Sequence, residues 1–205
     1  MRRTAWFGGG LALAAAAYAP VLRHWYLTWG ATAEEEQARL PGDDLLPGAD
    51  LRTTRAISID AAPEQVWPWL VQMGSGRAGA YTYDWIENLL GLDMHSADHI
   101  LPQFQHLEVG DVLPLGKDGP GLRVEICDAP RTLVLRSEDE RWVWIFSLTE
   151  QWLGTRLVSR NLITEDGTSP IRRLADRVIM EPGSLVMERK MLQGIRRRAE
   201  HVPAA

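Results

Sequence analysis

Residues 54–73 read T-R-A-I-S-I-D-A-A-P-E-Q-V-W-P-W-L-V-Q-M, and this stretch decides the fold. Residues 54–59 alternate with a period of two and include β-branched side chains, which is typical of a strand. The residues that follow predict a helix, because Asp60 can cap it and Pro63 suits its first turn. Pro68 lies inside the helical pattern, as a kink or an early first-turn proline. The helix carries an apolar stripe formed by Val66, Trp67, Leu70 and Val71.

This strand, the motif D-A-A-P-E-Q-V-W and the helix after it resemble the start of the SRPBCC superfamily, which comprises START-related, polyketide cyclase/dehydrase-like and pollen-allergen-like domains. The resemblance covers residues 52–200, mainly as an order of elements. It implies an α+β helix-grip fold, in which a curved antiparallel sheet wraps around a long C-terminal helix and leaves an apolar cavity. Because one fold serves many functions, the resemblance supports the fold better than a function.

The rest of the domain fits this order of elements. A short helix is expected at residues 83–90, and a long final helix at residues 182–200 after a helical lead-in at 172–180. Strands are expected near residues 111–115, 122–126, 131–137, 142–150 and 155–162. The connections between these strands are too short for parallel crossovers, so the sheet is expected to be an antiparallel meander.

Composition and charge narrow the class of protein. The chain has 205 residues, 45% of them hydrophobic and 24% charged, which is typical of one globular domain with an appendage. The net charge of −5 does not suggest a nucleic-acid-binding surface, so no nucleic-acid partner is expected. The single cysteine, Cys127, excludes an internal disulfide framework and is interpreted as a structural thiol on a strand.

An apolar segment occupies the N-terminus, residues 1–29. The run from Thr4 to Leu22 carries no charged residue. Its length is close to the ~20 residues that a membrane-spanning helix needs. Arg2 and Arg3 precede this run, and aromatic residues suited to a membrane interface follow it at Trp25, Tyr26 and Trp29. We interpret the segment as a retained single-pass transmembrane anchor. The alternative is a cleaved signal peptide ending at the small-residue pattern Ala17-Tyr18-Ala19.

The flanking charges and the next segment complete the domain organisation. Two arginines before the apolar run against Arg23 after it favour a cytoplasmic N-terminus, which places the domain outside the cytoplasm. Residues 30–51 contain an acidic run and two Pro-Gly pairs, so we expect a solvated linker of turns. The SRPBCC-like domain then spans residues 52–200, and residues 201–205 form a tail.

The segment D-M-H-S-A-D-H, residues 93–99, is the strongest candidate for polar chemistry. His95 and His99 have the i, i+4 spacing of one helical face, which can hold a metal. However, Ser96 stands where the H-E-x-x-H motif has its glutamate, and no further ligand set is evident. We expect no metal and no cofactor. Three roles stay open for the segment: a structural or gating loop, a polar group in the pocket, and a metal site.

Further polar candidates flank the short helix. Asp84 and Glu87 lie at i, i+3 and form either a general acid/base pair or a solvated face, and we favour the solvated face. Tyr81 and Tyr83 either donate hydrogen bonds to a ligand carbonyl or anchor the helix edge. The arginine run at residues 196–198 is either a contact with anionic lipid heads or a solvated helix end.

The candidate cavity residues come from the aromatic strand, the final helix and the loops between them. One face of the strand at residues 142–150 is aromatic, and Met187 and Met191 lie at i, i+4 on the final helix. The full set of cavity candidates is Tyr83, Trp85, Met94, His95, His99, Trp142, Trp144, Phe146, Met187 and Met191.

Three functions fit the sequence. The first, which we favour, is binding, with transport as an extension, of a hydrophobic small molecule or lipid by a membrane-tethered domain. The second is an enzyme of the cyclase/dehydratase or hydrolase type that uses pocket histidine and carboxyl groups. The third is a protein-interaction domain whose cavity is filled by its own side chains.

Overall fold

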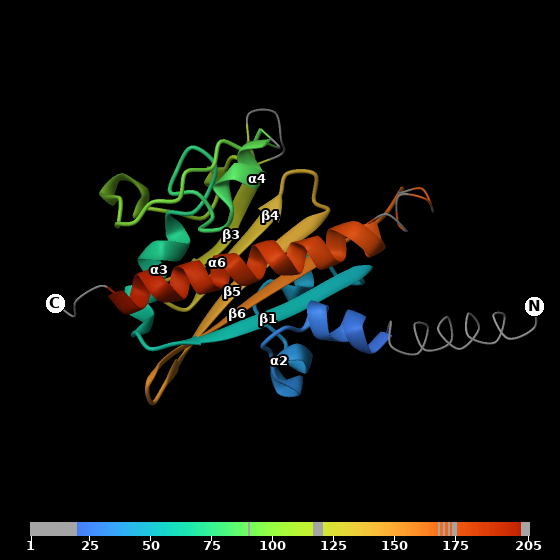
Figure 1. The fold of residues 1–205 in the computed structure, drawn as a ribbon, viewed down its shortest axis with the longest axis horizontal. Helices are drawn as coiled ribbons and strands as arrows, with labels where there is room; N and C mark the ends of the chain where they lie inside the picture. The colour runs from blue at the N-terminus through green and yellow to red at the C-terminus, as the bar shows by residue number, and fades with distance from the viewer. Residues whose placement is uncertain are drawn as a thin grey trace, which may run out of the picture.

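The computed structural model describes residues 20–89, 91–116, 121–167, 169, 171, 173 and 176–201. In this part of the chain an antiparallel sheet curves around a long C-terminal helix (Figure 1). The strands are β1 (Leu51–Ile59), β2 (Val112–Leu113), β3 (Leu122–Asp128), β4 (Thr132–Ser137), β5 (Trp142–Gln151) and β6 (Gly154–Ile163). The helices are residues 20–27, α2 (Ala33–Gln37), η1 (Asp43–Leu45), α3 (Pro63–Val71), α4 (Asp84–Leu89), η2 (Pro102–Phe104), η3 (Asp176–Met180) and α6 (Glu181–His201).

The sheet has the strand order β1-β6-β5-β4-β3-β2, and every neighbouring pair is antiparallel. Strands β2 to β6 form the meander that the short connections predicted. The first strand closes the sheet at its far edge by pairing with the last, from Leu51 opposite Ile163 to Ile59 opposite Thr155. The expected α+β fold with a curved antiparallel sheet and a long final helix is therefore confirmed.

The helix α3 begins differently from the prediction. Its N-cap residue is Ala62, not Asp60, and the side chain of Gln65 accepts a hydrogen bond of 3.0 Å from the Ala62 backbone N–H. Pro63 occupies the first turn, where its missing N–H costs nothing, and Pro68 lies inside the helix. Asp60 instead donates its backbone N–H to the side chain of Glu200, which links the end of β1 to the last turn of α6.

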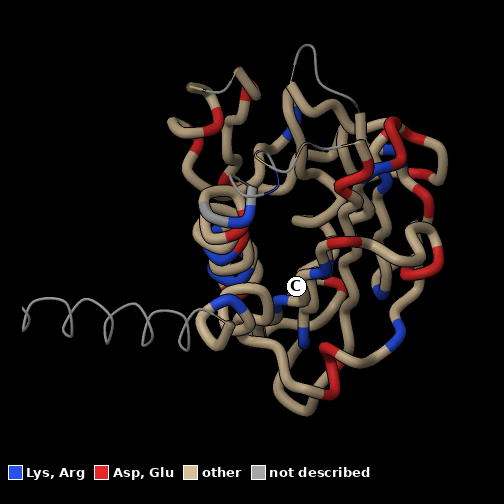
Figure 2. Tube along the Cα trace, turned by 90° about the vertical axis from the view of Figure 1, so that its right-hand side faces the viewer, with Lys and Arg blue, Asp and Glu red and all other residues tan. Residues whose placement is uncertain are grey.

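The main core lies between the sheet's concave face, α3 and α6. It contains inward-facing residues of β3 to β6 and the buried side chains Met191, Leu192, Ile195 and Ala199 of α6. Two positions on this helix run against residue type: the apolar Val186 is 53% exposed, and the charged Glu188 is buried. In Figure 2, Lys and Arg recur along α6, whereas Asp and Glu predominate on the opposite side of the molecule.

The interpretation of residues 30–51 as a solvated linker is wrong. This segment packs against the convex face of the sheet, where Leu40, Leu45 and Leu46 join a second apolar cluster with residues of β4, β5 and β6. The buried guanidinium of Arg160 donates hydrogen bonds to the backbone carbonyls of Glu35 and Ala38 and pairs with Asp43. The two Pro-Gly pairs do lie in turns, but the acidic run forms the helix α2, and Arg160 of β6 holds the segment on the sheet.

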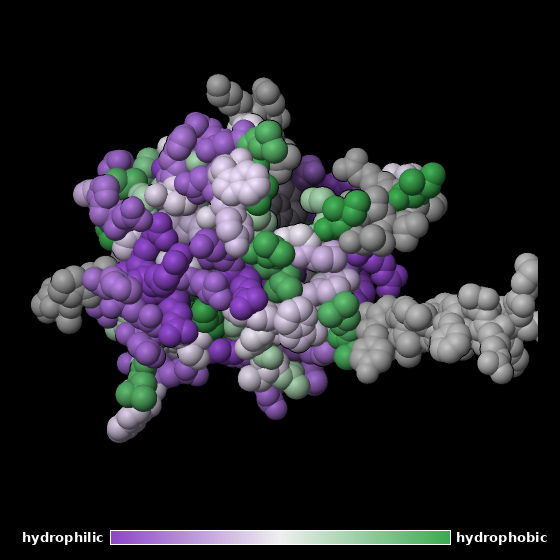
Figure 3. Space-filling view, viewed as in Figure 1, coloured by the Kyte–Doolittle hydropathy of each residue, from purple (hydrophilic) through white to green (hydrophobic). Residues whose placement is uncertain are grey.

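Most of the expected membrane anchor, residues 1–19, lies outside the described residues. Within the described part of the chain, none of the helices has both the length and the apolar character needed to cross a bilayer. The helical residues 20–27 expose Val21, Leu22 and Trp25. Figure 3 shows exposed apolar side chains on the face that carries α6, next to the point where the described chain begins.

Candidate functional site

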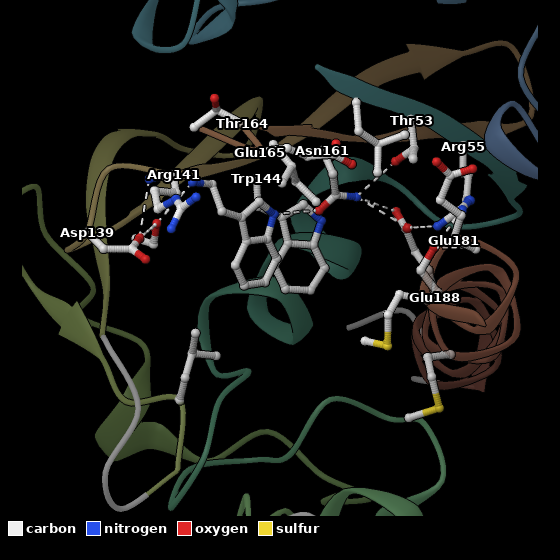
Figure 4. Close-up of a pocket in the computed structure, with 18 of the residues that line it drawn as sticks. Thr53, Arg55, Asp139, Arg141, Trp144, Asn161, Thr164, Glu165, Glu181 and Glu188 are labelled. Carbon is white, nitrogen blue, oxygen red and sulfur yellow. Dashed lines mark hydrogen bonds and ion pairs between the residues drawn. The ribbon is translucent and has the colours of Figure 1, made fainter. Parts of the chain in front are cut away.

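A cavity of about 730 Å³ lies between the concave face of the sheet and α6. Trp142 and Trp144 of β5 line it, as do Met187 and Met191 of α6. Figure 4 shows Trp144 on the side of the cavity that the sheet forms. Alternate residues of a strand point to the same face, so the two tryptophans are neighbours on the concave side. Their rings stack with centroids 5.3 Å apart and planes inclined by 23°. The result is a broad aromatic surface that faces two adaptable methionine side chains.

The polar edges of both tryptophans are already hydrogen-bonded within the protein. The indole Nε1–H of Trp142 donates to Oδ1 of Asn161 over 2.9 Å, and that of Trp144 donates to Oγ of Ser159 over 2.9 Å. Both acceptors belong to β6, the strand next to β5 in the sheet. A ligand in the cavity therefore meets apolar ring surface, because the indole donors are occupied.

A buried ion pair joins the sheet to α6 at the cavity wall. The guanidinium of Arg55 on β1 pairs with the carboxylate of Glu188 on α6, and both side chains are buried. Glu188 also accepts hydrogen bonds from Ser159 over 2.6 Å and from Asn161 over 3.2 Å. Arg55 uses its remaining nitrogens on Oγ of Ser184 and on a backbone carbonyl. The two charges and the two tryptophans thus form one connected polar network (Figure 4).

A second ion pair lies at the N-terminal end of α6. Glu181, which lines the cavity, accepts two hydrogen bonds from Arg23, with Nε and Nη2 at 2.9 and 2.8 Å from its two oxygens. The hydroxyl of Tyr26 donates to the same carboxylate over 3.2 Å. The helical residues 20–27 are therefore fastened to α6 beside the cavity.

Glu87 is the cavity's one lining residue from α4, and its setting differs from that of the other acids. It is only 7% exposed, and burial raises the pKa of its carboxyl group. Its Oε2 atom is buried and has no hydrogen-bond partner among the described residues. The expectation that Asp84 and Glu87 form a solvated face is therefore wrong for Glu87. Asp84 is half-buried and accepts two hydrogen bonds from Ser96, over 2.7 Å from its N–H and 2.6 Å from its hydroxyl.

Of the ten predicted cavity residues, the structure places four on the cavity wall: Trp142, Trp144, Met187 and Met191. Phe146 is fully buried behind Trp144, with ring centroids 4.7 Å apart, and belongs to the core. Trp85 is 70% exposed and does not line the cavity. Tyr83 lies under the ammonium group of Lys190, 5.3 Å from the ring centroid. Met94 is buried, and both its backbone polar groups bond to the Asn88 side chain.

The segment that contains the two histidines is not helical, so the i, i+4 geometry proposed for a metal does not form. His95 and His99 are exposed and do not line the cavity. The His95 ring lies 3.2 Å from Asp93, and the backbone carbonyl of His99 accepts a hydrogen bond from Gln72. Among the described residues there is no cluster of three His, Cys, Asp or Glu side chains able to hold a metal ion. The described contacts favour a structural role for this loop.

Three other side chains singled out in the sequence have structural contacts. Tyr81 is buried, and its hydroxyl donates to the backbone carbonyl of Trp69 over 2.9 Å, so it anchors the region after α3. The Sγ of Cys127 donates to the carbonyl of Leu107, and burial raises the pKa of this thiol, which disfavours a nucleophilic thiolate. Arg198 lies over the Tyr81 ring and pairs with Asp98.

Sequence reasoning missed the polar wall formed by Arg55, Asn161 and Glu188. A signal was present for two of these residues. Arg55 shares its strand face with two isoleucines at i+2 and i+4, and that face is buried. Glu188 lies three residues from both Leu185 and Met191, within the apolar stripe of the helix. A charged residue on each of two buried faces is typical of an ion pair between those faces.

Comparisons with known proteins give likenesses of structure alone. No family model and no curated protein matches the sequence. The chain is similar to the solution structure of KanY protein, with 13% identity, coverage of 75% of this chain and 99% of that one, and a TM-score of 0.48. It is also similar to a Polyketide_cyc-like protein from Corynebacterium glutamicum, with 17% identity, coverage of 78% and 100%, and a TM-score of 0.41. A third similar structure is an AHSA1-like protein from Aeromonas hydrophila, with 16% identity, coverage of 76% and 99%, and a TM-score of 0.41.

Proposed function

We propose that this protein binds a hydrophobic small molecule or lipid in the cavity between α6 and the sheet. The observation that carries this proposal is a cavity of about 730 Å³ whose walls include stacked tryptophans and two methionines. Ligand pockets in proteins are typically apolar, of ~300–1,000 Å³, and oriented by a few polar groups. The resemblance of residues 54–73 to the SRPBCC superfamily implies the same use of the cavity.

The enzymatic alternative loses most of its candidate groups. Of the four acid/base side chains considered for it, His95, His99 and Asp84 do not line the cavity. Glu87 does line it and keeps a raised pKa. One buried carboxyl group is suited to holding a ligand as well as to proton transfer, so binding is the function that these residues support best.

We propose further that the N-terminal segment tethers the domain at a membrane, with the cavity near the lipid. Three apolar side chains, Val21, Leu22 and Trp25, are exposed on the helical residues that continue the uncharged run starting at Thr4. Those helical residues are bound through Arg23 to Glu181, which lines the cavity. A membrane-bound chain of this kind would hold its cavity close to a source of hydrophobic ligand.

Binding of Nile red, a neutral hydrophobic fluorophore, tests the proposed function. Met187→Trp adds volume at a half-buried lining position, and is therefore a better blocking change than one at the fully buried Met191. Val186→Trp makes the same kind of change on the outer face of the same helix and serves as the matched control. We expect Nile red to bind the unmodified chain and the Val186→Trp variant, and to lose at least tenfold in affinity for Met187→Trp. Unchanged binding to a folded Met187→Trp variant would contradict the proposal.

A further inference from the structure

The carboxylates that line the cavity differ in whether they are already bound. Glu188 is paired with Arg55 and hydrogen-bonded to Ser159, and Glu181 is paired with Arg23. The other two have partners as well: Asp139 accepts from Ser137, and Glu165 lies 3.5 Å from Arg173. Glu87 is the exception in the described part of the lining, because its Oε2 atom is buried without a partner.

An unpartnered buried oxygen is costly, since a polar group removed from water without a hydrogen bond loses ~1–3 kcal/mol. Such a group in a native structure therefore calls for a partner that arrives from outside. The rest of the wall offers a ligand little polar attraction, because the indole donors and the Arg55 guanidinium are occupied. Glu87 is thus the ionisable group that remains available to a ligand, and among the other described lining side chains only the Thr82 hydroxyl has a buried oxygen or nitrogen atom that lacks a partner.

The surroundings of Glu87 favour its uncharged form. Burial is the largest cause of its raised pKa, and the negative charge of Asp84 on the same helix acts in the same direction, while the Thr82 side chain opposes them. The neighbouring charged groups are engaged elsewhere. Lys190 of α6 lies over the Tyr83 ring, and His95 of the following loop is exposed beside Asp93. A protonated carboxyl group has one O–H donor.

We propose that Glu87 is the polar anchor of the cavity, and that it donates a hydrogen bond to a carbonyl oxygen at one end of an otherwise apolar, uncharged ligand. This inference rests on the proposed function and specifies its ligand class. Fatty anions are disfavoured, because both arginines of the described lining are engaged: Arg55 is paired with Glu188, and Arg141 donates to the backbone carbonyl of Asp166. An uncharged ketone, aldehyde or ester with an apolar body fits both the aromatic wall and the donor.

Three probes of matched length, 2-undecanone, undecane and undecylamine, test this proposal on the full chain. Quenching of tryptophan fluorescence reports binding, since Trp142 and Trp144 line the cavity. We expect 2-undecanone to bind about fivefold more tightly than undecane, which is the size of one net hydrogen bond. This preference should weaken as the pH rises above the pKa of Glu87, because the ionised group has no proton to donate.

Two variants and one control separate the outcomes. Glu87→Leu should abolish the preference for the ketone while undecane still binds, and Glu87→Gln should keep the preference and make it independent of pH. Glu64→Gln, at an exposed position on α3, should behave like the unmodified chain. A ketone preference that persists in Glu87→Leu would overturn the assignment, as would a preference for undecylamine over 2-undecanone at low pH, where Glu87 is uncharged. If none of the probes binds, the proposed function itself fails. If Glu87→Leu does not fold, a pH-dependent preference in Glu87→Gln overturns the assignment.

Discussion

At the residue scale, the cavity wall depends on a buried ion pair between Arg55 and Glu188, which lie 133 positions apart in the chain. Burying two charges costs more than their attraction returns unless further hydrogen bonds satisfy them. Both partners have such bonds here, from Ser184 to the arginine and from Ser159 and Asn161 to the glutamate. The pair therefore fixes the position of α6 over the sheet and, through its hydrogen bonds, the orientation of the tryptophans.

Removing one partner of this pair should be strongly destabilising. We expect Arg55→Met to lower the free energy of unfolding by ~3–5 kcal/mol, because it leaves the Glu188 charge buried and unpaired. The double variant Arg55→Met/Glu188→Met should recover a large part of this loss. Urea denaturation of the single and double variants measures both quantities. A loss below ~1 kcal/mol for Arg55→Met, or a double variant whose loss equals the sum of the singles, would show that the pair is not coupled in this way.

Glu87 should make the protein less stable as the pH rises. Its folded-state pKa is raised above its ordinary value of 4.5, so the folded chain keeps a proton that the unfolded chain releases. Its contribution to stability is fully present below pH 4.5 and is lost as the pH rises through the folded-state pKa. We expect Glu87→Gln to raise the melting temperature at pH 8 relative to the unmodified chain, and to raise it much less at pH 4. An equal effect at both pH values would contradict a raised pKa.

Single residues were predictable from the sequence where local periodicity decides their position. Trp142 and Trp144 alternate on a strand, so their common face follows from the pattern. Arg55 and Glu188 were not predicted, because their burial depends on each other and no local pattern contains both. Glu87 was misassigned for a related reason, since a carboxylate on a short helix is solvated unless a distant element covers it.

At the element scale, residues 33–45 are a second layer on the convex face of the sheet. Their contacts with the sheet combine the apolar cluster around Leu40 and Leu45 with the hydrogen bonds donated by Arg160. Gly42 lies at the closest approach: its φ angle is +97°, and an added Cβ would meet the side chain of Val134 at 2.8 Å. A solvated linker would show neither the close approach nor the buried arginine.

Two glycine substitutions test this docking. Gly42→Ala should destabilise the protein by ~1–3 kcal/mol more than Gly48→Ala does. Both glycines have a positive φ angle and so suffer similar backbone strain, but nothing lies within 4 Å of a Cβ added at Gly48. The difference between their midpoints of chemical denaturation isolates the packing against β4. Equal effects of the two substitutions would show that the segment is not pressed against the sheet.

The order of elements was predictable from the sequence, but two local conformations were not. Short connections and alternating patterns located the meander, and periodicity located α6. The loop at residues 93–99 was expected to be compatible with a helix, yet Asp93 has a φ angle of +50° and the side chain of Asn88 bonds both backbone groups of Met94. These side-chain contacts replace helical hydrogen bonds and cannot be derived from the spacing of two histidines.

At the scale of the whole molecule, the sheet, α6 and the helical residues 20–27 meet at one end of the cavity. Glu181 is the common point, since it lines the cavity, begins α6 and binds Arg23. In the sequence, the uncharged run of the N-terminus is followed directly by Arg23, the residue that binds Glu181. A membrane tether placed here would bring lipid and cavity together.

Membrane fractionation of the full chain tests the tether. We expect the full chain to stay in the membrane fraction after alkaline carbonate extraction, because the run from Thr4 to Leu22 is long enough to span the bilayer core. A shortened chain that starts at Pro20 keeps the Arg23–Glu181 pair and should be released. Recovery of a mature N-terminus close to Pro20 would instead identify the segment as a cleaved signal peptide.

The most direct measurement of the central claim, an apolar cavity that holds a ligand, is native mass spectrometry of the full chain incubated with a total lipid extract. We expect one bound molecule of an uncharged, largely apolar compound per chain. The same adduct should be present on Val186→Trp and absent from Met187→Trp, since Met187 lines the cavity and Val186 does not. An unmodified chain that shows only its bare mass, or an adduct that persists on a folded Met187→Trp variant, would contradict the claim.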